Sequence, residues 1–387
     1  MSGRFGAFRE RFPAYREGVY VNHAAISPVS DLAWDAADSY LHMRSSLPVD
    51  IYPDIEQVRQ QFVGDIAALI GAGTSEAIAL VQNTSHGLNV VASGINWTHG
   101  DRILLVRNEF PANGYPFLNL ESQGVIIDWV DPDENGCVTA DMVAAALKSR
   151  TRLFSISHVQ FLSGFKADLH EIGRVCREKH IIFVVDGIQG VGASGLNVEE
   201  DGIDALACGG HKWLMWPMGV AFLYLSPALL EQLRPVHAGW LSVRNAWDLF
   251  DYRLDFVDSA GRFELGTMNW MGISMAAPML ETFMDLGIPE IERRILSLTG
   301  RLMDGLSDQG LEVITPRENR ERAGIVSVRL EEADRVLQEL VDRDIFAAVR
   351  EGVLRFSPHI TNNEADIDQI LTVMDAGIQE GWICRSL

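Results

Sequence analysis

The stretch at residues 181–225 constrains the fold of this chain more than any other part of its sequence. It begins with the apolar run Ile-Ile-Phe-Val-Val, which predicts a strand buried on both faces, and this run ends at Asp186. The later apolar runs DALACGG and GVAFLYL predict two further short strands, with Lys212 between them. Because open α/β sheets bind their ligands at the carboxyl ends of their strands, this stretch predicts a ligand site that contains Asp186 and Lys212.

Asp186 and Lys212 together favour one cofactor. A lysine considered alone is most often a solvated loop residue, and this is the alternative reading of Lys212. Pyridoxal phosphate needs an amine that holds its aldehyde and an anion that keeps its pyridine nitrogen protonated as an electron sink. We therefore expect pyridoxal 5'-phosphate as the cofactor, with Lys212 as its Schiff-base lysine and Asp186 as the partner of the pyridine nitrogen.

The sequence VVDGIQ followed by GGHKW resembles the class V, cysteine-desulfurase-like branch of the fold-type I pyridoxal-phosphate enzymes. Members of that family carry the pattern Asp-x-x-Gln/His and then Ser/Gly-x-His-Lys. The resemblance implies that Gln189 approaches the ring hydroxyl of the cofactor and that His211 helps to hold its phosphate. It also implies an amino acid as the small-molecule substrate.

Strand and helix patterns alternate through residues 75–225, which predicts a mainly parallel sheet covered by helices on both faces. With the family resemblance, we expect the α/β fold of the fold-type I pyridoxal-phosphate-dependent transferases, with a smaller α+β domain at the C-terminus. The chain of 387 residues, 47% of them hydrophobic, is long enough for two compact domains. We expect a large cofactor-binding domain at residues 16–285 and a small domain made of residues 1–15 and 286–387.

The composition excludes several other classes of protein. A net charge of −21 disfavours nucleic-acid and anionic membrane partners, and no apolar run reaches the ~18 residues that would span a bilayer. The four cysteines lie scattered without metal-ligand spacing, so we expect reduced thiols and no metal site. The first residues lack the apolar core of a signal peptide, and the expected location is the cytoplasm.

The segment Asn83-Thr84-Ser85-His86-Gly87 lies between a predicted strand and an amphipathic helix. Thr84 or Ser85 suits the N-cap position, and the N–H groups of a first helical turn can hold a phosphate. The segment resembles the Thr-Thr/Ser-x-Gly phosphate turn of the class V family. This resemblance implies that Thr84 and Ser85 bind the cofactor phosphate beside the backbone amide of His86, whereas the alternative is an ordinary helix cap.

The sequence Glu-Phe-Pro-Ala-Asn at residues 109–113 follows another predicted strand. Class V enzymes often carry Glu-His-x-x-Asn here, and their histidine stacks on the pyridine ring. The resemblance implies that Phe110 stacks instead, although a phenylalanine cannot move protons; a core aromatic is the alternative. Relatives often read Ser-His-Val-Ser-Asn where this chain has residues 157–161, so their contact with the ring hydroxyl is lost here or is made by Gln160.

Candidates for binding the substrate come from both ends of the chain. Asn22 and His23 belong to an Asn-x-Ala-Ala segment that lines the substrate mouth in class V enzymes, and the alternative is a plain connection. Residues 350–358 resemble the Arg-x-Gly…Arg-x-Ser ending of that family, which implies that Arg355 holds a substrate carboxylate through a bidentate fork rather than lying on the surface. Trp216 replaces a family glycine near the lysine, so we expect it to narrow the site; packing in the core or at a dimer interface is the alternative.

The segment Arg262-Phe263-Glu264-x-Gly266-Thr267 resembles an Arg-Phe-Glu-x-Gly-Thr segment of the class V family. In relatives this segment reaches the cofactor phosphate of the neighbouring subunit. The resemblance therefore implies a homodimer whose active sites lie at the interface and are completed by Gly266 and Thr267. A turn closed by a small residue is the alternative.

The segment between the two arginine motifs bears on the reaction. Cysteine desulfurases of this family carry a nucleophilic cysteine there, whereas this chain has only Glu-Gly-Val-Leu between Arg350 and Arg355, so we expect that it is not a cysteine desulfurase. The resemblance favours a class V aminotransferase, with a C–S or C–Se β-lyase and an epimerase similar to isopenicillin N epimerases as alternatives. A catalytically retired scaffold that still binds pyridoxal phosphate is an alternative of another class, although the intact Asp186, Lys212 and Arg355 disfavour it.

Overall fold

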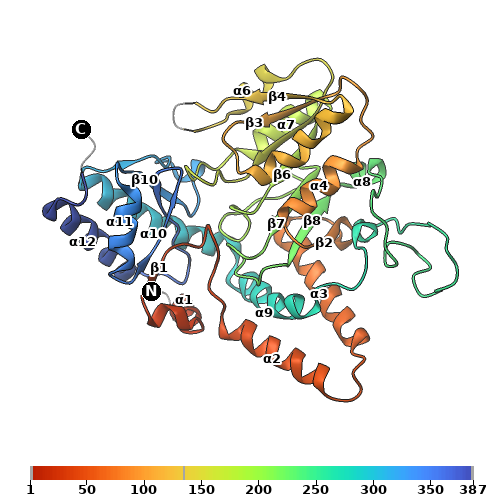
Figure 1. The fold of residues 1–387 in the computed structure, drawn as a ribbon, viewed down its shortest axis with the longest axis horizontal. Coiled ribbons are helices and arrows are strands. Elements are labelled where there is room, and N and C mark those ends of the chain that lie inside the picture. The colour runs from red at the N-terminus through yellow and green to blue at the C-terminus, as the bar shows by residue number, and fades with distance from the viewer. Residues whose placement is uncertain (1–2, 134–135, 385–387) are drawn as a thin grey trace.

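The computed structural model describes residues 3–133 and 136–384, and a seven-stranded sheet lies at its centre (Figure 1). The strand order is β2-β8-β7-β6-β5-β3-β4. Strand β8 runs antiparallel to both of its neighbours, and the other neighbouring pairs of this sheet are parallel. The strands of this sheet are β2 (Ile78–Val81), β3 (Arg102–Val106), β4 (Ile126–Val130), β5 (Thr151–Ser157), β6 (Ile182–Asp186), β7 (Ala205–Gly209) and β8 (Ala221–Leu225).

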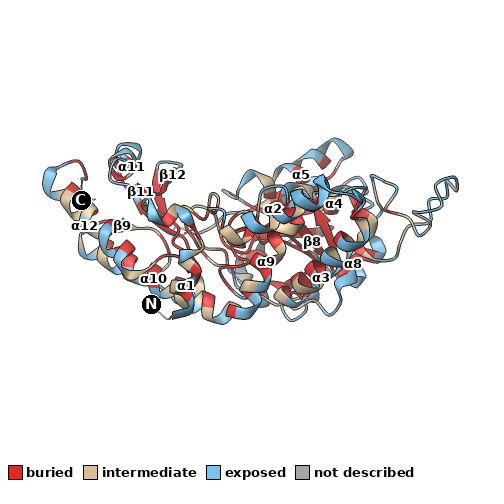
Figure 2. Ribbon diagram, turned by 90° about the horizontal axis from the view of Figure 1, so that it is seen from below, coloured by how far each residue is buried: buried red, intermediate tan, exposed pale blue. Residues whose placement is uncertain are grey.

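Two hydrophobic cores cover the two faces of this sheet, as the buried strands in Figure 2 show. Along β3, Leu104 and Val106 belong to one core, and Ile103 and Leu105 belong to the other, because successive side chains of a strand point to opposite faces. Strands β7 and β8 are buried along their whole length. The predicted fold class, a mainly parallel sheet between layers of helices, is confirmed.

The helices follow the apolar periodicity of the sequence. In α7, the Asp168 side chain caps the N-terminus by accepting a hydrogen bond from the Glu171 N–H at 3.1 Å, and an apolar face packs inward. The helices are α1 (Gly3–Glu10), α2 (Asp31–Ser45), α3 (Tyr52–Ile70), α4 (Thr84–Gly94), α5 (Tyr115–Leu118), α6 (Ala140–Ala146), α7 (Leu169–Lys179), α8 (Pro227–Gln232), α9 (Trp270–Leu286), α10 (Ile288–Asp308), α11 (Ala333–Val341) and α12 (Glu364–Glu380).

The C-terminal part of the chain forms a smaller layer of helices on an antiparallel sheet, at the left of Figure 1. Its sheet has the order β12-β13-β10-β9 and has a hydrophobic core of its own. The strands are β9 (Glu312–Val313), β10 (Val326–Arg329), β12 (Ala348–Arg350) and β13 (Val353–Phe356), and β1 (Val19–Tyr20) pairs in parallel with β11 (Ile345–Phe346). The N-terminal segment therefore joins this part of the fold beyond the predicted boundary at residue 15, and the division into domains stays a prediction.

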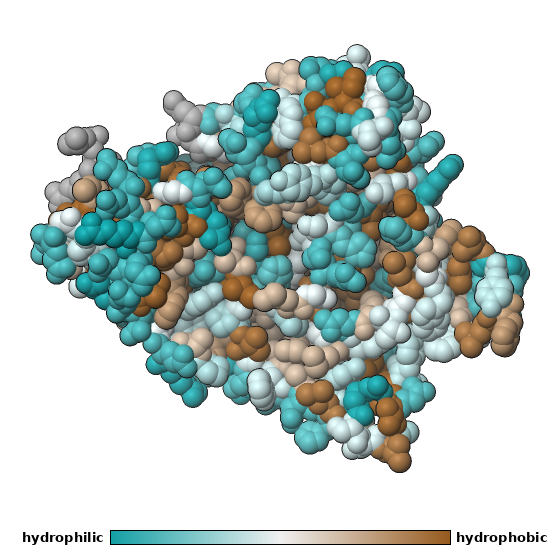
Figure 3. All heavy atoms as spheres, viewed as in Figure 1, coloured by the Kyte–Doolittle hydropathy of each residue, from teal (hydrophilic) through white to brown (hydrophobic). Residues whose placement is uncertain are grey.

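Exposed large apolar side chains gather in two parts of the surface, besides others that lie elsewhere. One is the projecting loop (residues 236–257), at the right of Figures 1 and 3, and the other is the C-terminal half of α2 with the turn that follows it. The side chains concerned are Leu41, Met43, Leu47, Trp247, Leu249, Phe250, Tyr252 and Leu254. Among the described residues, none of the helices combines the length and the apolar character that crossing a membrane requires.

Candidate active site

A cavity of about 300 Å³ opens at the carboxyl ends of β6 and β7, where the sequence predicted a ligand site. Asp186 is the last residue of β6, and Lys212 follows the end of β7 in the loop that leads to β8. The cavity brings together most of the site residues predicted from the sequence, which are Thr84, Ser85, Phe110, Asp186, Gln189, His211, Lys212 and Arg355.

Lys212 is only 9% exposed, and burial lowers the pKa of its amine from 10.5 to about 8. The carboxylate of Asp186 opposes this shift, whereas the positive charge of Arg355 adds to it. The amine lies 5.6 Å from the centre of the Phe110 ring. A buried lysine with a depressed pKa is the form of the residue that can act as a nucleophile near neutral pH, so the solvated-loop alternative does not describe Lys212.

The depressed pKa of Lys212 predicts how the cofactor-free protein reacts with pyridoxal phosphate at different pH values. The neutral amine is the reactive form, and its fraction rises as the pH passes through about 8. We therefore expect the rate of covalent attachment, trapped with borohydride and read by mass spectrometry, to increase from pH 6 and to level off above pH 9. A rate that keeps rising tenfold per pH unit beyond pH 9 would show an unperturbed lysine instead.

Asp186 is 1% exposed, and burial raises the pKa of its carboxyl group to about 6. Its Oδ1 accepts a hydrogen bond from the Ile188 N–H at 3.0 Å, which lowers the pKa, and the charge of Lys212 lowers it further. The raised value shows that these partners do not fully compensate the buried carboxylate. A cationic group in the cavity, such as a protonated pyridine nitrogen, would supply the missing partner.

The start of α4 differs from its prediction in two details. Asn83, and not Thr84 or Ser85, is the N-cap, because its Oδ1 accepts the hydrogen bond of the His86 N–H at 2.8 Å. The backbone amide of His86 is therefore already paired within the cap, and the expectation that it lies beside the phosphate pair is wrong. Thr84 is buried and accepts a hydrogen bond from the Gly209 N–H at 3.0 Å, whereas Ser85 is exposed to the cavity.

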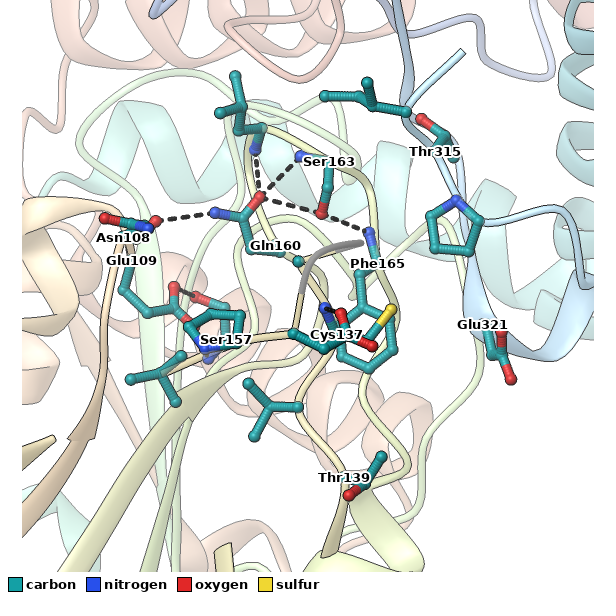
Figure 4. A pocket seen from close by; sticks show the side chains of 18 of the residues that line it. Asn108, Glu109, Cys137, Thr139, Ser157, Gln160, Ser163, Phe165, Thr315 and Glu321 are labelled. Carbon is teal, nitrogen blue, oxygen red and sulfur yellow. Dashed lines mark hydrogen bonds between the residues drawn. The ribbon is translucent and has the colours of Figure 1, made fainter. Parts of the chain in front are cut away.

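Gln189 and Gln160 have different environments. Gln189 lines the cavity, and its amide group donates to the Ala24 carbonyl at 3.0 Å and accepts from the Trp213 indole at 2.8 Å. It keeps one N–H for a ligand. Gln160 instead faces a larger neighbouring pocket, where it donates to the Asn108 carbonyl at 2.8 Å and accepts from the turn that follows it (Figure 4). This bonding holds Gln160 outside the cavity at Lys212, and the contact of Gln189 with the ring hydroxyl stays a prediction.

Phe110 lines the cavity with a ring that is 44% exposed, so the alternative of a core aromatic does not describe it. Its edge packs against Phe161, with the ring centres 5.5 Å apart. Trp216, by contrast, is 3% exposed and packs on Phe62 away from the cavity lining. The expectation that Trp216 narrows the site is wrong, because the indole lies in the core, where Gly210 makes room for it: a Cβ there would lie 1.9 Å from the ring.

Arg355 reaches the cavity from β13 and is 2% exposed. One Nη donates to the carbonyl of Phe161 at 2.7 Å, and its Nε has no hydrogen-bond partner among the described residues. Burial lowers the pKa of the guanidinium to about 9, and the nearby charge of Arg350 contributes to this shift. A buried guanidinium with an unpaired N–H fits a carboxylate ligand, which accepts from two of its donors at once.

Several predicted residues lie outside this cavity. His23 is fully buried between the Tyr15 hydroxyl, 2.9 Å away, and the Ser357 carbonyl, 3.0 Å away, so the structure places it in the protein core. The structure does not bring Asn22 to the lining either, although the next residue after His23, Ala24, contributes to it. His86, Gly266 and Thr267 line a separate cavity of about 180 Å³.

Glu109 is a half-buried acid that was not predicted as a site residue from the sequence. Its carboxylate accepts hydrogen bonds from the N–H of Ser157, at 2.9 Å, and from the Ser157 hydroxyl, as Figure 4 shows. Burial raises the pKa of Glu109 to about 7, and the negative charge of Asp186 adds to this effect. The sequence did offer a sign of this role, because Glu109 follows β3 at the ligand edge of the sheet and directly precedes Phe110. The carboxylate belongs to the larger pocket, where it connects the Phe110 loop to β5.

The cavity fits pyridoxal phosphate. It contains a buried amine with a low pKa, a buried carboxylate without full compensation, and hydroxyl groups at the start of α4. Gly209 leaves room at this end, since a Cβ there would lie 3.2 Å from the Thr84 hydroxyl and 3.3 Å from the His211 ring. The donor set thus provides an anchor for the aldehyde, a partner for the ring nitrogen and hydroxyls for the phosphate.

The fold and this site define a pyridoxal-phosphate-dependent enzyme, an aminotransferase or a lyase. Residues 41–370 match the family Aminotransferase class-V, and the chain belongs to this family. A probable cysteine desulfurase of Methanothermobacter thermautotrophicus is 27% identical over 89% of this chain and 86% of its own length. An uncharacterized aminotransferase of Schizosaccharomyces pombe is 25% identical over 97% of this chain and 96% of its own length. The apo structure of the cysteine desulfurase from Thermococcus onnurineus NA1 superposes on this chain with a TM-score of 0.88 and 25% sequence identity. The superposition covers 96% of this chain and 97% of that structure.

These relatives correct the sequence-based expectation about the reaction. The chain was expected not to be a cysteine desulfurase, because no cysteine lies between Arg350 and Arg355, and the family resemblance was taken to favour an aminotransferase. That exclusion is wrong, since proteins named cysteine desulfurases match most of the chain in both sequence and structure. The missing loop cysteine removes one route, in which a nucleophilic thiol takes the sulfur, but a C–S bond can also break by β-elimination, which needs groups around the cofactor and no loop cysteine.

Proposed function

We propose that the protein breaks the C–S bond of a sulfur-containing amino acid such as L-cysteine. The observation that carries this proposal is the meeting of Lys212, Asp186 and Arg355 at one cavity, since these supply an amine, an anion and a carboxylate anchor. The names of the relatives supply the sulfur chemistry, because probable cysteine desulfurases are 27% and 28% identical to this chain over more than four-fifths of its length.

In this proposal Lys212 has two roles. Its amine would hold the aldehyde of pyridoxal phosphate, and with a substrate bound the same amine would remove the proton from Cα. Its depressed pKa suits both roles, because the amine is neutral in a large fraction of molecules near pH 8. Bound pyridoxal phosphate supplies an electron sink for the charge at Cα, and Asp186 keeps the ring nitrogen protonated.

The other cavity residues position the reactants. Thr84, Ser85 and His211 are proposed to hold the phosphate, because they meet where α4 begins and β7 ends. Gln189 is proposed to donate its remaining N–H to the ring hydroxyl, and Phe110 is proposed to stack on the ring with its exposed face. Asn22 and His23, which lie outside the cavity lining, are assigned no contact with the substrate.

Arg355 is proposed to select amino acids through their α-carboxylate. Replacing Arg355 by alanine should raise KM for L-cysteine about 10- to 100-fold, because hydrogen bonds to a charged group are lost. Replacement by lysine should recover only part of this loss, since an ammonium cannot form the two-pronged contact. Steady-state kinetics check this, with Arg329→Ala as the control, because Arg329 lies on neighbouring β10 and pairs with Glu312 on the surface. Equal KM values for wild type and Arg355→Ala would remove this role.

A homodimer is proposed as the working form in the cytoplasm. The exposed apolar side chains of the projecting loop and of α2 support this, because apolar surfaces of this kind are commonly covered by a partner. Thr267 is also exposed, so that it is accessible to a second subunit, and together with Gly266 it is proposed to reach the partner's cofactor phosphate. A mass in solution equal to one 42.9 kDa chain at micromolar concentration would oppose the dimer.

The proposed reaction is tested by adding single amino acids to the purified protein loaded with pyridoxal phosphate, in the presence of a thiol. L-Cysteine should yield sulfide together with alanine or pyruvate, and sulfide is measured directly. Keto acid formation from sulfur-free amino acids, with no sulfide from L-cysteine or L-cystine, would contradict the proposal. The Lys212→Ala protein is the control for sulfide released by free cofactor.

A further inference from the structure

Trp213, the residue directly after Lys212, is held by both parts of the fold. Its indole is 1% exposed and donates to the Gln189 side chain at 2.8 Å. From the C-terminal part, Gly324 approaches the indole so closely that a Cβ there would lie 2.1 Å from the ring. The ring of His359 lies beside the indole as well, with the ring centres 5.4 Å apart. The segment His211-Lys212-Trp213, called the lysine segment below, is therefore packed against the C-terminal part of the molecule.

The hydrogen bonds of His359 define its tautomer. The Ile360 N–H donates to Nδ1 at 2.7 Å, so that Nδ1 is an acceptor without a proton. His359 is fully buried, and burial lowers its pKa to about 4, so the ring is neutral. The proton of a neutral ring must then be on Nε2, which lies 2.9 Å from the Trp213 carbonyl and donates to it.

The other two carbonyls of the lysine segment also accept hydrogen bonds from a distant residue, Ser27. Ser27 donates from its N–H to the His211 carbonyl at 2.9 Å and from its hydroxyl to the Lys212 carbonyl. With His359 on the Trp213 carbonyl, three consecutive carbonyls accept hydrogen bonds from segments far away in the sequence. Such bonding fixes the direction in which the Lys212 side chain leaves the backbone, between Asp186 and the ring of Phe110.

We propose that His359 is a positioning residue for Lys212, acting through the Trp213 carbonyl. The inference rests on the proposed function, in which Lys212 is the residue that binds the cofactor covalently. Without the imidazole, the buried carbonyl of Trp213 loses its donor, and the lysine segment gains other conformations. The charged groups that face the amine (Asp186, Arg350 and Arg355) remain unchanged, so an effect on Lys212 reports position rather than charge.

The test compares how fast Lys212 binds pyridoxal phosphate in the cofactor-free protein, trapped with borohydride and quantified on the Lys212 peptide by mass spectrometry. His359→Leu should slow attachment about tenfold, because a buried hydrogen bond is lost. His359→Gln should recover most of the rate, since its amide can donate to the same carbonyl. Thr315→Val is the matched control: Thr315 is also buried and accepts from the Ser327 N–H at 2.9 Å, far from the lysine segment.

Thermal unfolding of each variant distinguishes a displaced Lys212 from a general loss of protein stability. The expected result is slow attachment in His359→Leu at temperatures where it remains folded, and a wild-type rate in Thr315→Val. Equal rates in His359→Leu and wild type, or equal slowing in His359→Leu and Thr315→Val, would overturn the role of His359 alone. Wild-type protein without cofactor on Lys212 would overturn the proposed function and this inference with it.

Discussion

Replacing Lys212 by alanine is expected to lower sulfide formation from L-cysteine by roughly 10²–10⁴-fold or more, because the proton-transferring group at Cα is removed. The same variant loses the covalent link to pyridoxal phosphate, since the cavity offers no other amine of a lysine. The fold should be retained, because among the described residues the Lys212 amine has a contact with the Phe110 ring but no hydrogen bond or ion pair. Initial rates of sulfide release at pH 8 give the effect.

Lys166→Ala is the matched control for this variant. Lys166 is half-buried, whereas Lys212 is buried, and the Lys166 amine pairs with Glu292 at 2.8 Å away from the cavity. Its loss should leave sulfide formation within a small factor of wild type. If Lys212→Ala and Lys166→Ala retained the same activity, the assignment of the catalytic lysine would have to be abandoned.

Replacing Asp186 by asparagine is expected to lower turnover about 100-fold or more, while the protein still binds its cofactor. A buried charge that loses its partner costs roughly 3–5 kcal/mol, and each 1.4 kcal/mol in the barrier is about tenfold in rate. The assay is best made at pH 8, because the pKa of Asp186 is raised to about 6 and its carboxyl group is then ionised.

Asp204→Asn provides the control for Asp186→Asn. Asp204 is a half-buried carboxylate directly before β7, which accepts from the Phe183 N–H at 2.9 Å and the Ser226 hydroxyl at 3.0 Å, at the opposite ends of the strands. Its replacement should lower stability and leave turnover per folded molecule unchanged. Near-normal turnover of Asp186→Asn with a full complement of cofactor would rule out the pairing with the ring nitrogen.

The order of strands and helices and the central pair of the site could be predicted from the sequence, because both depend on local patterns. Apolar runs specify buried strands, and the end of such a run specifies where a polar residue meets the ligand edge, as for Asp186. The spacing of the Lys212 motif then identified its partner on the neighbouring strand. In the structure both residues line the same cavity.

Details that depend on distant partners could not be predicted in this way. His86 was expected to present its amide to a ligand, but Asn83 uses that amide in the helix cap, and local sequence does not decide between the two. Trp216 lies in the core against Gly210 and Phe62, and its packing on Phe62 joins it to a residue of the distant helix α3. The hydrogen bond from His359 to the lysine segment joins residues 146 positions apart, and no pattern in the sequence indicates it.

The most direct test of the account is to reduce the loaded protein with borohydride and to map the cofactor-bearing peptide by mass spectrometry. The lysines of the chain are Lys148, Lys166, Lys179 and Lys212, so the four possible positions are easily distinguished. The account predicts the mass of one reduced pyridoxal phosphate on Lys212 in each chain. A label on Lys148, Lys166 or Lys179 in its place, or no label at all, would contradict it.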